Sequence, residues 1–344
     1  MASEPSRKFI VHTSTAQIGG AETSLLEAIA STREKPLFLV PAEGPLTKAL
    51  AERGLAFRVL TWPVGLSSLT QSRWLALPLI LPGLIPYLFR LYAAVRGVDT
   101  LWSSGLKSHC SCLPLAPWLG KALVFDIRDF LRPRLLRKVI AGGVKFFGCR
   151  VRANSKSVGN DYPGVKVYYP IVKTLRPPVD KRRRGGKLVI THLAYFAPYK
   201  GQDLFLDCAR KLLDAGVDAE FWMIGDVIYP AESYKRYREM VHARAASLQL
   251  STHVRFFGKV GSGEEVQALL EQTHLLLHCT REPEPYGRAV MEALLCGCEV
   301  VCHRESGVCE VTRTSATFSK WLQPLQFVLG KNYVQVALPS GVTL

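Results

Sequence analysis

The sequence predicts an α/β protein of two Rossmann-like domains, each built on a doubly wound parallel sheet. The chain has 344 residues, which corresponds to about two domains at roughly 150 residues each. Short apolar runs alternate with segments of helical periodicity, and this alternation stops once, at residues 176–187, before it restarts. A hydrophobic content of 48% excludes a disordered chain, and neither Gly nor heptad patterning is strong enough for a collagen-like or coiled-coil rod.

In the first predicted domain, residues 1–175, short apolar runs predict strands, and segments such as 21–31 and 134–141 have helical spacing. This alternation is typical of a parallel sheet with helices on both faces. The predicted strands are 8–13, 36–40, 55–60, 98–103, 121–127, 149–153 and 165–169.

One apolar segment interrupts this pattern. Residues 74–89 (WLALPLILPGLIPYLF) contain no charge and are flanked by arginines. The segment is shorter than the roughly 20 apolar residues that a membrane-spanning helix needs, and we expect Pro78, Pro82 and Pro86 to break it. A buried connection and an interfacial anchor on anionic lipid are both consistent with it, and the surrounding positive charge favours the anchor.

Residues 176–187 (RPPVDKRRRGGK) lack apolar periodicity and predict an exposed linker. A nucleic-acid patch is the alternative, but no aromatic residues are interleaved to stack on bases. The second domain, residues 188–344 with a short C-terminal tail, repeats the α/β alternation. Its predicted strands are 187–193, 219–225, 253–257, 274–279 and 299–303, and its predicted helices are 201–215, 231–248, 263–272 and 287–296.

Charge and cysteine usage narrow the possible partners. The net charge is +16, and the first 175 residues hold 23 Lys and Arg against 10 Asp and Glu, whereas the rest hold 21 against 18. A basic first half indicates an anionic partner, such as a lipid surface. The nine cysteines form no C-x-x-C pair, and no signal peptide opens the chain, so we expect reduced thiols, a cytoplasmic protein and no metal site.

The segment from Glu284 to Gly297 could carry chemistry. It follows a predicted strand, and Gly287 opens a predicted helix whose first N–H groups, near Arg288 and Ala289, form a ready anion site. Glu284 precedes this helix and Glu292 lies about one turn inside it. One carboxylate could therefore reach sugar hydroxyls and the other a ribose.

Two further elements follow strands in the same way. Lys200 stands before Gly201 at the start of a predicted helix, where a lysine can neutralise a diphosphate. Gly19 and Gly20 follow the first strand, and paired glycines let the backbone approach a phosphate or sugar closely. A tight turn explains these glycines equally well.

In this order the motifs resemble those of glycosyltransferase family 4, retaining enzymes of the GT-B fold, over residues 8–310. The motifs that carry the resemblance are Gly19-Gly20-Ala-Glu, Asn154-Ser155, Lys200-Gly201, Gly225-Asp226, Val254-x-Phe-x-Gly258, the block from Glu284 to Glu292, and Gly307-x-x-Glu310. The resemblance implies two domains facing a central cleft, a nucleotide-diphosphate sugar as donor, and no cofactor or metal ion.

The resemblance also implies roles for individual residues. Lys200 and the backbone at Gly287–Ala289 would hold the diphosphate, Glu292 the ribose, and Glu284 the transferred sugar. The implied catalytic residues are Glu284, Lys200, Arg128 and Asp129. The implied donor-binding residues are Gly19, Gly20, Lys200, Gly225, Gly258, Lys259, Glu284, Tyr286, Gly287, Arg288, Ala289 and Glu292.

The sequence departs from the family pattern at three places. Tyr195 stands where the family usually has an Arg, and Arg128 replaces a His beside Asp129, where a structural Arg–Asp ion pair is the alternative to a catalytic role. Only 34 residues follow Glu310, and residues 318–330 could form a shortened version of the family's last helices.

The sequence therefore predicts a retaining hexosyltransferase that acts on a lipid-linked or surface-polysaccharide precursor, such as that of lipopolysaccharide, at the inner face of the cytoplasmic membrane. The expected partners are the nucleotide sugar, the glycan or lipid-linked acceptor and an anionic membrane surface, without nucleic acid. A GT-B epimerase or phosphorylase and a catalytically degenerate binding subunit remain as alternatives. No G-x-G-x-x-G opens either domain, which argues against a nicotinamide dehydrogenase.

Overall fold

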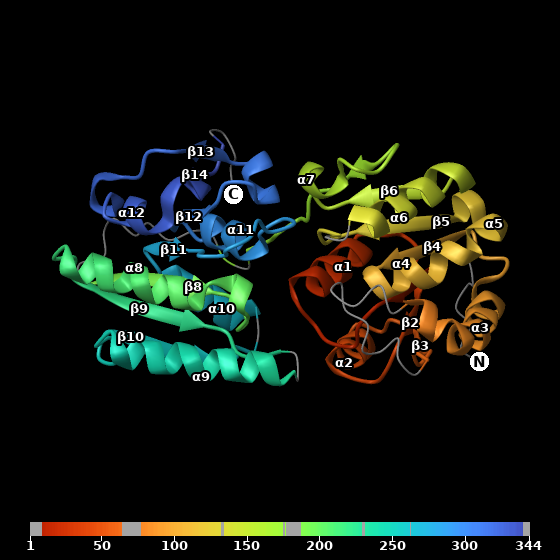
Figure 1. Cartoon of the computed structure of the whole chain (residues 1–344), viewed down its shortest axis with the longest axis horizontal. Coiled ribbons are helices and arrows are strands. Elements are labelled where there is room, and N and C mark those ends of the chain that lie inside the picture. Colours follow the sequence, from red (N-terminus) through yellow and green to blue (C-terminus); the bar gives the residue numbers. More distant parts are fainter. Residues whose placement is uncertain are drawn as a thin grey trace. The chain divides into compact units, whose positions relative to one another are not determined.

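The computed structural model describes residues 9–63, 77–131, 134–174, 176, 187–228, 231–261 and 263–339. For residues 77–82 it describes the backbone but not the side chains. The chain divides into two compact units, Met1–Ile171 and Val172–Leu344. Each unit contains a seven-stranded sheet with helices on its faces (Figure 1). Two Rossmann-like sheets of this kind confirm the predicted fold class. Most of the predicted linker, residues 177–186, lies outside the described residues.

The sheet of the first unit is parallel throughout, in the order β3-β2-β1-β4-β5-β6-β7. The order changes direction between β1 and β4, and the crevice beyond such a point is where sheets of this type bind ligands. The strands are β1 Phe9–Thr13, β2 Leu37–Val40, β3 Phe57–Val59, β4 Thr100–Ser104, β5 Leu123–Ile127, β6 Arg150–Ala153 and β7 Lys166–Val167. The helices are α1 Gly20–Ala30, α2 Pro45–Glu52, α3 Leu77–Val95, α4 Leu106–Cys112, α5 Ala116–Leu119, α6 Arg134–Phe147 and α7 Lys156–Gly159.

Two apolar cores lie on opposite faces of this sheet, because successive strand residues point to opposite sides. Ile10 of β1 belongs to the core that includes Tyr87 of α3 and Ile140 of α6. Val11, the next residue, belongs to the core that includes Leu25 of α1 and Leu46 of α2. Both faces of the sheet are therefore covered by helices.

Helix α3 corrects one expectation. The apolar segment was expected to be broken by its prolines, but α3 runs through Pro82 and Pro86. Leu84, Tyr87 and Leu91 of this helix are buried, and each contributes about 1.5–3 kcal/mol of burial, which offsets the roughly 3 kcal/mol cost of an interior proline. Within the described part of the chain, no helix has the length and apolar character needed to cross a bilayer.

The sheet of the second unit has the order β10-β9-β8-β11-β12-β14-β13. Its strands are β8 Leu188–Leu193, β9 Ala219–Ile224, β10 Val254–Gly258, β11 Leu275–Leu277, β12 Glu299–His303, β13 Arg313–Ser315 and β14 Tyr333–Ala337. Its α-helices are α8 Gln202–Asp214, α9 Glu232–Ser247, α10 Gly263–Gln272, α11 Arg288–Leu295 and α12 Leu325–Leu329. Its 3₁₀ turns include η5 Pro198–Lys200, η6 Gly307–Glu310 and η7 Lys320–Leu322.

The C-terminal segment adds strands that the sequence analysis did not predict. β14 runs antiparallel to both β12 and β13, so this sheet is mixed rather than purely parallel. Residues 318–330 form η7 and the short helix α12. Helix α12 packs against α8, and apolar side chains of both helices belong to one core of the second unit. Residues 333–337 (YVQVA) are mostly apolar, and β14 contributes to cores on both faces of the sheet, Tyr333 to one and Val334 and Val336 to the other.

Candidate active site

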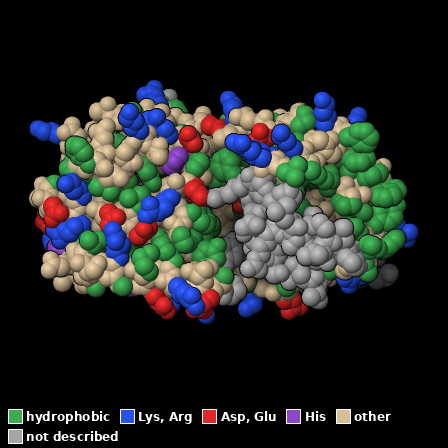
Figure 2. Space-filling view, viewed as in Figure 1, with side chains coloured by type: hydrophobic (Ala, Val, Ile, Leu, Met, Phe, Trp, Pro, Cys, Tyr) green, Lys and Arg blue, Asp and Glu red, His purple; other side chains and the backbone are tan. Residues whose placement is uncertain are grey.

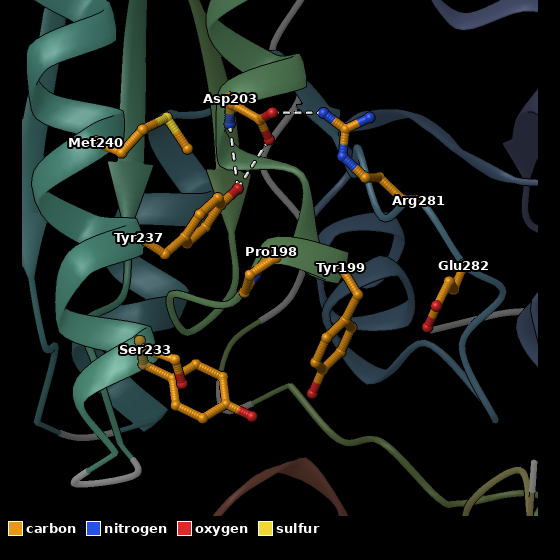
Figure 3. Close-up of a pocket in the computed structure, with 9 residues that line it drawn as sticks. Pro198, Tyr199, Asp203, Ser233, Tyr237, Met240, Arg281 and Glu282 are labelled. Atoms are coloured by element: carbon orange, nitrogen blue, oxygen red, sulfur yellow. Dashed lines mark hydrogen bonds and ion pairs between the residues drawn. The ribbon is translucent and has the colours of Figure 1, made fainter. Parts of the chain in front are cut away.

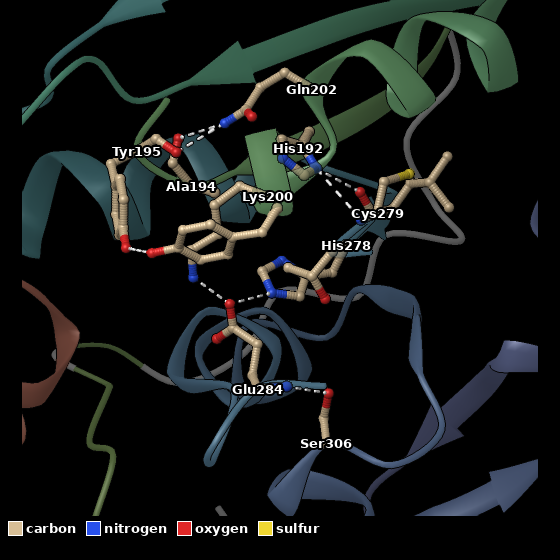
Figure 4. Close-up of polar contacts among 12 residues, drawn as sticks. His192, Ala194, Tyr195, Lys200, Gln202, His278, Cys279, Glu284 and Ser306 are labelled. Carbon is tan, nitrogen blue, oxygen red and sulfur yellow. Dashed lines mark hydrogen bonds and ion pairs between the residues drawn. The ribbon is translucent and has the colours of Figure 1, made fainter. Parts of the chain in front are cut away.

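Lys200 and Glu284, 84 residues apart in the chain, form an ion pair at the carboxyl edge of the second sheet. Lys200 ends η5, after β8, and Glu284 lies between β11 and α11. His278 Nε2 lies 3.4 Å from the Glu284 Oε1 atom that the Lys200 ammonium contacts (Figure 4). Because β8 and β11 are parallel neighbours, the loops that follow them meet at one edge. The structure thus brings together two predicted residues and adds His278, which the sequence analysis missed.

The ion pair is largely buried, with 13% of the Lys200 side chain and 15% of the Glu284 side chain exposed. Burial by itself raises the pKa of Glu284, but the Lys200 charge and His278 outweigh it and hold this pKa well below its ordinary value. The carboxylate is therefore ionised at neutral pH. An ionised carboxylate is a hydrogen-bond acceptor for hydroxyl groups, such as those of a sugar.

Two histidines lie behind Glu284. The rings of His192 and His278 stack with their centroids 5.9 Å apart. Burial, and then the proximity of His278, lowers the pKa of His192 to about 3, so this imidazole is neutral. His192 Nδ1 lies 3.0 Å from the Leu277 carbonyl oxygen. The sequence feature that could have indicated these two residues is a histidine near the end of each of two predicted strands, His192 in β8 and His278 after β11.

The loop that carries Glu284 is anchored on η6. The Glu284 N–H donates to Ser306 Oγ at 3.0 Å, and the Gly307 N–H donates to the Glu284 carbonyl at 3.0 Å. The Val308 N–H donates to the Tyr286 carbonyl at 2.6 Å. Tyr286 itself is buried. These backbone contacts fix the loop at both ends of the Glu284–Tyr286 segment and so limit the positions open to the carboxylate.

Helix α11 begins directly after this loop, as the sequence predicts. Gly287 precedes it with φ +97, a conformation that favours glycine, and a Cβ there would lie 3.2 Å from Val308. The N–H groups at the start of a helix, here those of Arg288 and Ala289, point out of its end and can bind an anion. Arg288 Nε lies 2.7 Å from Glu292 Oε1, so both predicted side chains lie on one face of the first turns.

Two glycines allow close backbone approach around Lys200. Gly201 has φ +71, and a Cβ there would lie 1.9 Å from the Cys279 carbonyl oxygen. Gly225 has φ +131, and a Cβ there would lie 2.0 Å from the Ala194 carbonyl oxygen. Both positions exclude any side chain, and Gly201 holds the start of α8 against the end of β11. Packing therefore explains Gly225, and a contact with the donor remains a prediction.

Tyr195 occupies the position where the resemblance leads one to expect an arginine. Lys200 Nζ lies 5.0 Å from the centre of the Tyr195 ring and 5.4 Å from that of Tyr199, and the two tyrosine hydroxyls contact each other. Aromatic faces attract cations. Residue 195 therefore lies beside Lys200, as an arginine would, but it adds no charge.

Gly258 and Lys259, which the resemblance implies as donor-binding residues bordering the base, lie at the end of β10, two strands from β8 in the sheet order. Gly258 has φ +68, and its carbonyl accepts a hydrogen bond from the Gly225 N–H at 2.9 Å. Lys259 is exposed. They border the same carboxyl edge as Lys200, because β8, β9 and β10 are parallel.

In the first unit, Gly19 and Gly20 lie at the start of α1. Gly19 is the N-cap residue, and its N–H donates to Glu22 Oε2 at 2.9 Å. A Cβ on Gly20 would meet nothing within 4 Å. Space around the backbone here fits either interpretation of the pair, a turn or a ligand contact.

Arg128 forms an ion pair with Asp126, the aspartate of β5. Its Nε lies 2.5 Å from Asp126 Oδ2, and its Nη1 donates to the Ala21 carbonyl at 3.2 Å. Arg152 Nε lies 3.0 Å from the other Asp126 oxygen. Asp129 Oδ1 accepts from the Phe130 N–H. Arg128 therefore ties the end of β5 to the first turn of α1.

The cysteine-rich segment after residue 296 forms no metal centre among the described residues, where no three His, Cys, Asp or Glu side chains are grouped to hold an ion. Cys302 and Cys309 Sγ lie 3.8 Å apart. Cys296 and Cys298 are buried in the core that α10 and α11 share.

Residues 178–319 match the family described as Glycosyl transferases group 1. A stretch of 145 residues is 27% identical to the GPI3 subunit of phosphatidylinositol N-acetylglucosaminyltransferase from Saccharomyces cerevisiae, covering 41% of this chain and 30% of the yeast protein. The chain thus spans less than a third of that relative's length.

Two solved structures show a similar fold. HepE of Anabaena, in complex with UDP and glucose, has a TM-score of 0.74 and 20% identity, over 94% of this chain and 89% of that one. A glycosyltransferase from Rickettsia africae has a TM-score of 0.61 and 16% identity, over 88% and 81%. The chain therefore has the GT-B fold, and its residues 178–319 are similar to the glycosyl transferases of group 1, which supports a glycosyltransferase.

Proposed function

We propose that this protein is a retaining glycosyltransferase that uses a nucleoside diphosphate sugar and acts on a lipid-linked or surface-polysaccharide precursor at the cytoplasmic membrane face. The observation that carries the proposal is the Lys200–Glu284 pair beside the start of α11. A cation, an ionised carboxylate and the N–H groups of a helix start are the groups that a diphosphate and its sugar need. The match over residues 178–319 and the UDP and UDP-glucose complexes of HepE support a nucleotide sugar as donor.

Each group has a role in this proposal. A bound diphosphate interacts with the Lys200 ammonium, which pairs with Glu284 in the free protein, and the N–H groups of Gly287–Ala289 donate to its other oxygens. Glu284 then accepts hydrogen bonds from the hydroxyls of the donor sugar. Glu292 binds the ribose, and the end of β10 borders the base.

In this proposal the sugar is transferred with retention of its anomeric configuration. The acceptor hydroxyl oxygen bonds to the anomeric carbon on the face from which the diphosphate departs. The bond between that carbon and the diphosphate oxygen breaks, its electron pair stays with the diphosphate, and the hydroxyl proton passes to a diphosphate oxygen. Lys200 and the start of α11 stabilise the charge that develops on the leaving group. The scheme requires no metal ion, so EDTA should leave turnover unchanged.

Release of nucleoside diphosphate from a panel of nucleotide sugars, with lipid extract as acceptor, tests the site. We expect Lys200→Ala, Glu284→Gln and Glu292→Gln each to slow release at least about 100-fold, the size of effect seen when a group that stabilises developing charge is removed. Lys211→Ala, on the exposed side of α8, is the matched control. Turnover near that of the unmodified protein in Lys200→Ala or Glu284→Gln refutes the site.

The same assay separates the alternatives. A GT-B epimerase would convert its nucleotide sugar without any lipid or glycan acceptor, and a phosphorylase would require inorganic phosphate in place of a nucleotide sugar. A binding subunit, which the uncharged Tyr195 favours, would bind the nucleotide sugar and never release its diphosphate.

A membrane-embedded acceptor is supported by the surface of the first unit around α6. This helix contains no acidic residue, and Phe146 is 82% exposed. Its exposed side chains are Arg134, Leu135, Lys138, Val139, Lys145 and Phe146. An exposed helix face with apolar and basic residues side by side is typical of helices that lie on anionic membranes.

Two further helices of the first unit, α3 and α5, also expose large apolar side chains. Ile85 and Phe89 of α3 and Trp118 of α5 are exposed large apolar side chains, and the Trp118 ring lies 6.0 Å from that of Tyr92 in α3. Figure 2 shows apolar side chains gathered over the part of the first unit where α3 and α5 lie. Contiguous exposed apolar surface marks a site of protein or membrane contact.

Co-sedimentation with phosphatidylcholine vesicles, with and without phosphatidylglycerol, tests this surface. Binding should require the anionic lipid, and Lys138→Glu with Lys145→Glu should weaken it at least about tenfold, since each basic residue near such a surface contributes about 1 kcal/mol. Lys48→Glu, on exposed α2 surface, is the matched control. Equal binding to neutral vesicles, or no effect of the double reversal, contradicts the membrane part of the proposal.

A further inference from the structure

Apart from the Lys200 site, the second unit has a pocket of about 640 Å³ beside η5. Its walls are η5, the first turn of α8, the N-terminal half of α9 and the residues after β11 (Figure 3). Its lining includes neither Lys200 nor Glu284, nor any residue around the start of α11. Its volume falls within the roughly 300–1,000 Å³ of small-molecule sites.

Among the described residues, the polar side chains that line the pocket form a network in which the one positive charge is paired with a carboxylate. The Tyr237 hydroxyl donates to Asp203 Oδ1 at 2.8 Å, and Arg281 Nη2 lies 2.5 Å from Asp203 Oδ2. Glu282 adds a second carboxylate to the lining. With two carboxylates and one guanidinium, this lining disfavours phosphate or any other anion.

The walls are aromatic and apolar. Tyr234, Tyr237 and Met240 line the pocket from α9, with the one-face spacing of a helix, and Tyr199 and Pro198 face them from η5 (Figure 3). Tyrosine offers a rigid apolar face together with a hydroxyl at its edge. Rings of this kind suit a ligand that has apolar faces and polar edges.

A neutral saccharide has this chemistry. The C–H faces of a pyranose can lie on the tyrosine rings, while its hydroxyls can bond to Asp203, Arg281 and Ser233. A purely apolar ligand would cover these polar groups without bonding to them, which is costly, and an anion meets the net negative lining.

The pocket is connected to the Lys200 site through Tyr199. This residue lines the pocket, and its ring centre lies 5.4 Å from Lys200 Nζ. The backbone N–H of Arg281 donates to the backbone carbonyl of Tyr199 at 2.9 Å. This bond connects the residues after β11 that line the pocket to η5. We propose that this pocket binds a neutral saccharide unit of the glycan on which the protein acts. Only the link to that glycan rests on the proposed function.

Saturation-transfer NMR and calorimetric titration of the full chain with glucose, N-acetylglucosamine, maltotriose and sodium sulfate test the proposal without turnover. At least one neutral saccharide should bind and sulfate should not. Tyr234→Ala should raise the Kd about three- to tenfold, the worth of one aromatic contact, and Ser233→Trp, which fills the pocket, should abolish binding. Glu239→Ala, on the exposed surface of the same helix, is the matched control.

A trisaccharide that binds more tightly than the monosaccharides points to a glycan chain, and equal affinities point to a free sugar. The proposal is overturned if none of the three saccharides binds, if sulfate binds instead, or if Ser233→Trp binds as the unmodified protein does. Saccharide binding in a protein that never releases nucleoside diphosphate would refute the proposed function and leave the pocket standing.

Discussion

Lys200→Met is the perturbation that most sharply tests the candidate site. The substitution keeps a long flexible side chain but leaves the Glu284 carboxylate without its ammonium partner. Glu284 stays largely buried, with 15% of its side chain exposed, and His278 Nε2 remains 3.4 Å away. Of the two side chains that the structure describes within ion-pair distance of this carboxylate, only His278 then remains to offset the cost of removing its charge from water.

The magnitude follows from this geometry. Breaking a buried ion pair by removing one partner costs about 3–5 kcal/mol, and we expect the lower end because both side chains keep some exposure and His278 remains. About 3 kcal/mol lowers the Tm of a unit of this size by about 6–12 °C. Adding Glu284→Gln removes the stranded charge and should recover about 2 kcal/mol.

Differential scanning calorimetry of the two single variants and the double variant, with UDP titration of each, forms a complete cycle. The double variant should be nearly as stable as the unmodified protein and yet bind nucleoside diphosphate weakly, which separates the role of Lys200 in folding from its proposed role in binding. The reasoning fails if Lys200→Met costs less than about 1 kcal/mol or if Glu284→Gln recovers nothing.

Three further predictions concern stability. Burial lowers the pKa of His192 from its ordinary 6.5 to about 3. Between these two pH values, the His192 imidazole is protonated in the unfolded chain but not in the folded protein. Stability is therefore fully present above about pH 6.5 and falls below it by up to about 1.4 kcal/mol per pH unit; urea unfolding at several pH values should show a smaller slope in His192→Phe. Gly201→Ala should cost at least about 2 kcal/mol more than Gly216→Ala, because both have positive φ but only Gly201 has a carbonyl oxygen 1.9 Å from its Cβ position; equal urea midpoints would contradict this. Arg128→Ala should cost about 1–3 kcal/mol, because Asp126 is buried and keeps only one guanidinium, and should speed amide exchange in the first turn of α1; unchanged exchange would remove its role in holding that turn.

Most of the secondary structure could be predicted because buried parallel strands are continuous apolar runs and the helices between them keep a 3.6-residue period. The exceptions have physical causes. Helix α3 runs through Pro82 and Pro86 because its buried face outweighs the lost hydrogen bonds. β14 was not predicted, because its pairing with β12 depends on residues that are far apart in the chain.

The candidate site was only partly visible in the sequence. The sequence by itself determined that Lys200, Glu284 and Gly287 follow strands or open a helix, because those positions depend on local pattern. Only the tertiary structure decided that Glu284 lies between Lys200 and His278, and that Arg128 pairs with Asp126. The reason is that strand order and side-chain direction, which no local pattern specifies, determine which strand ends meet and which charges share a buried site.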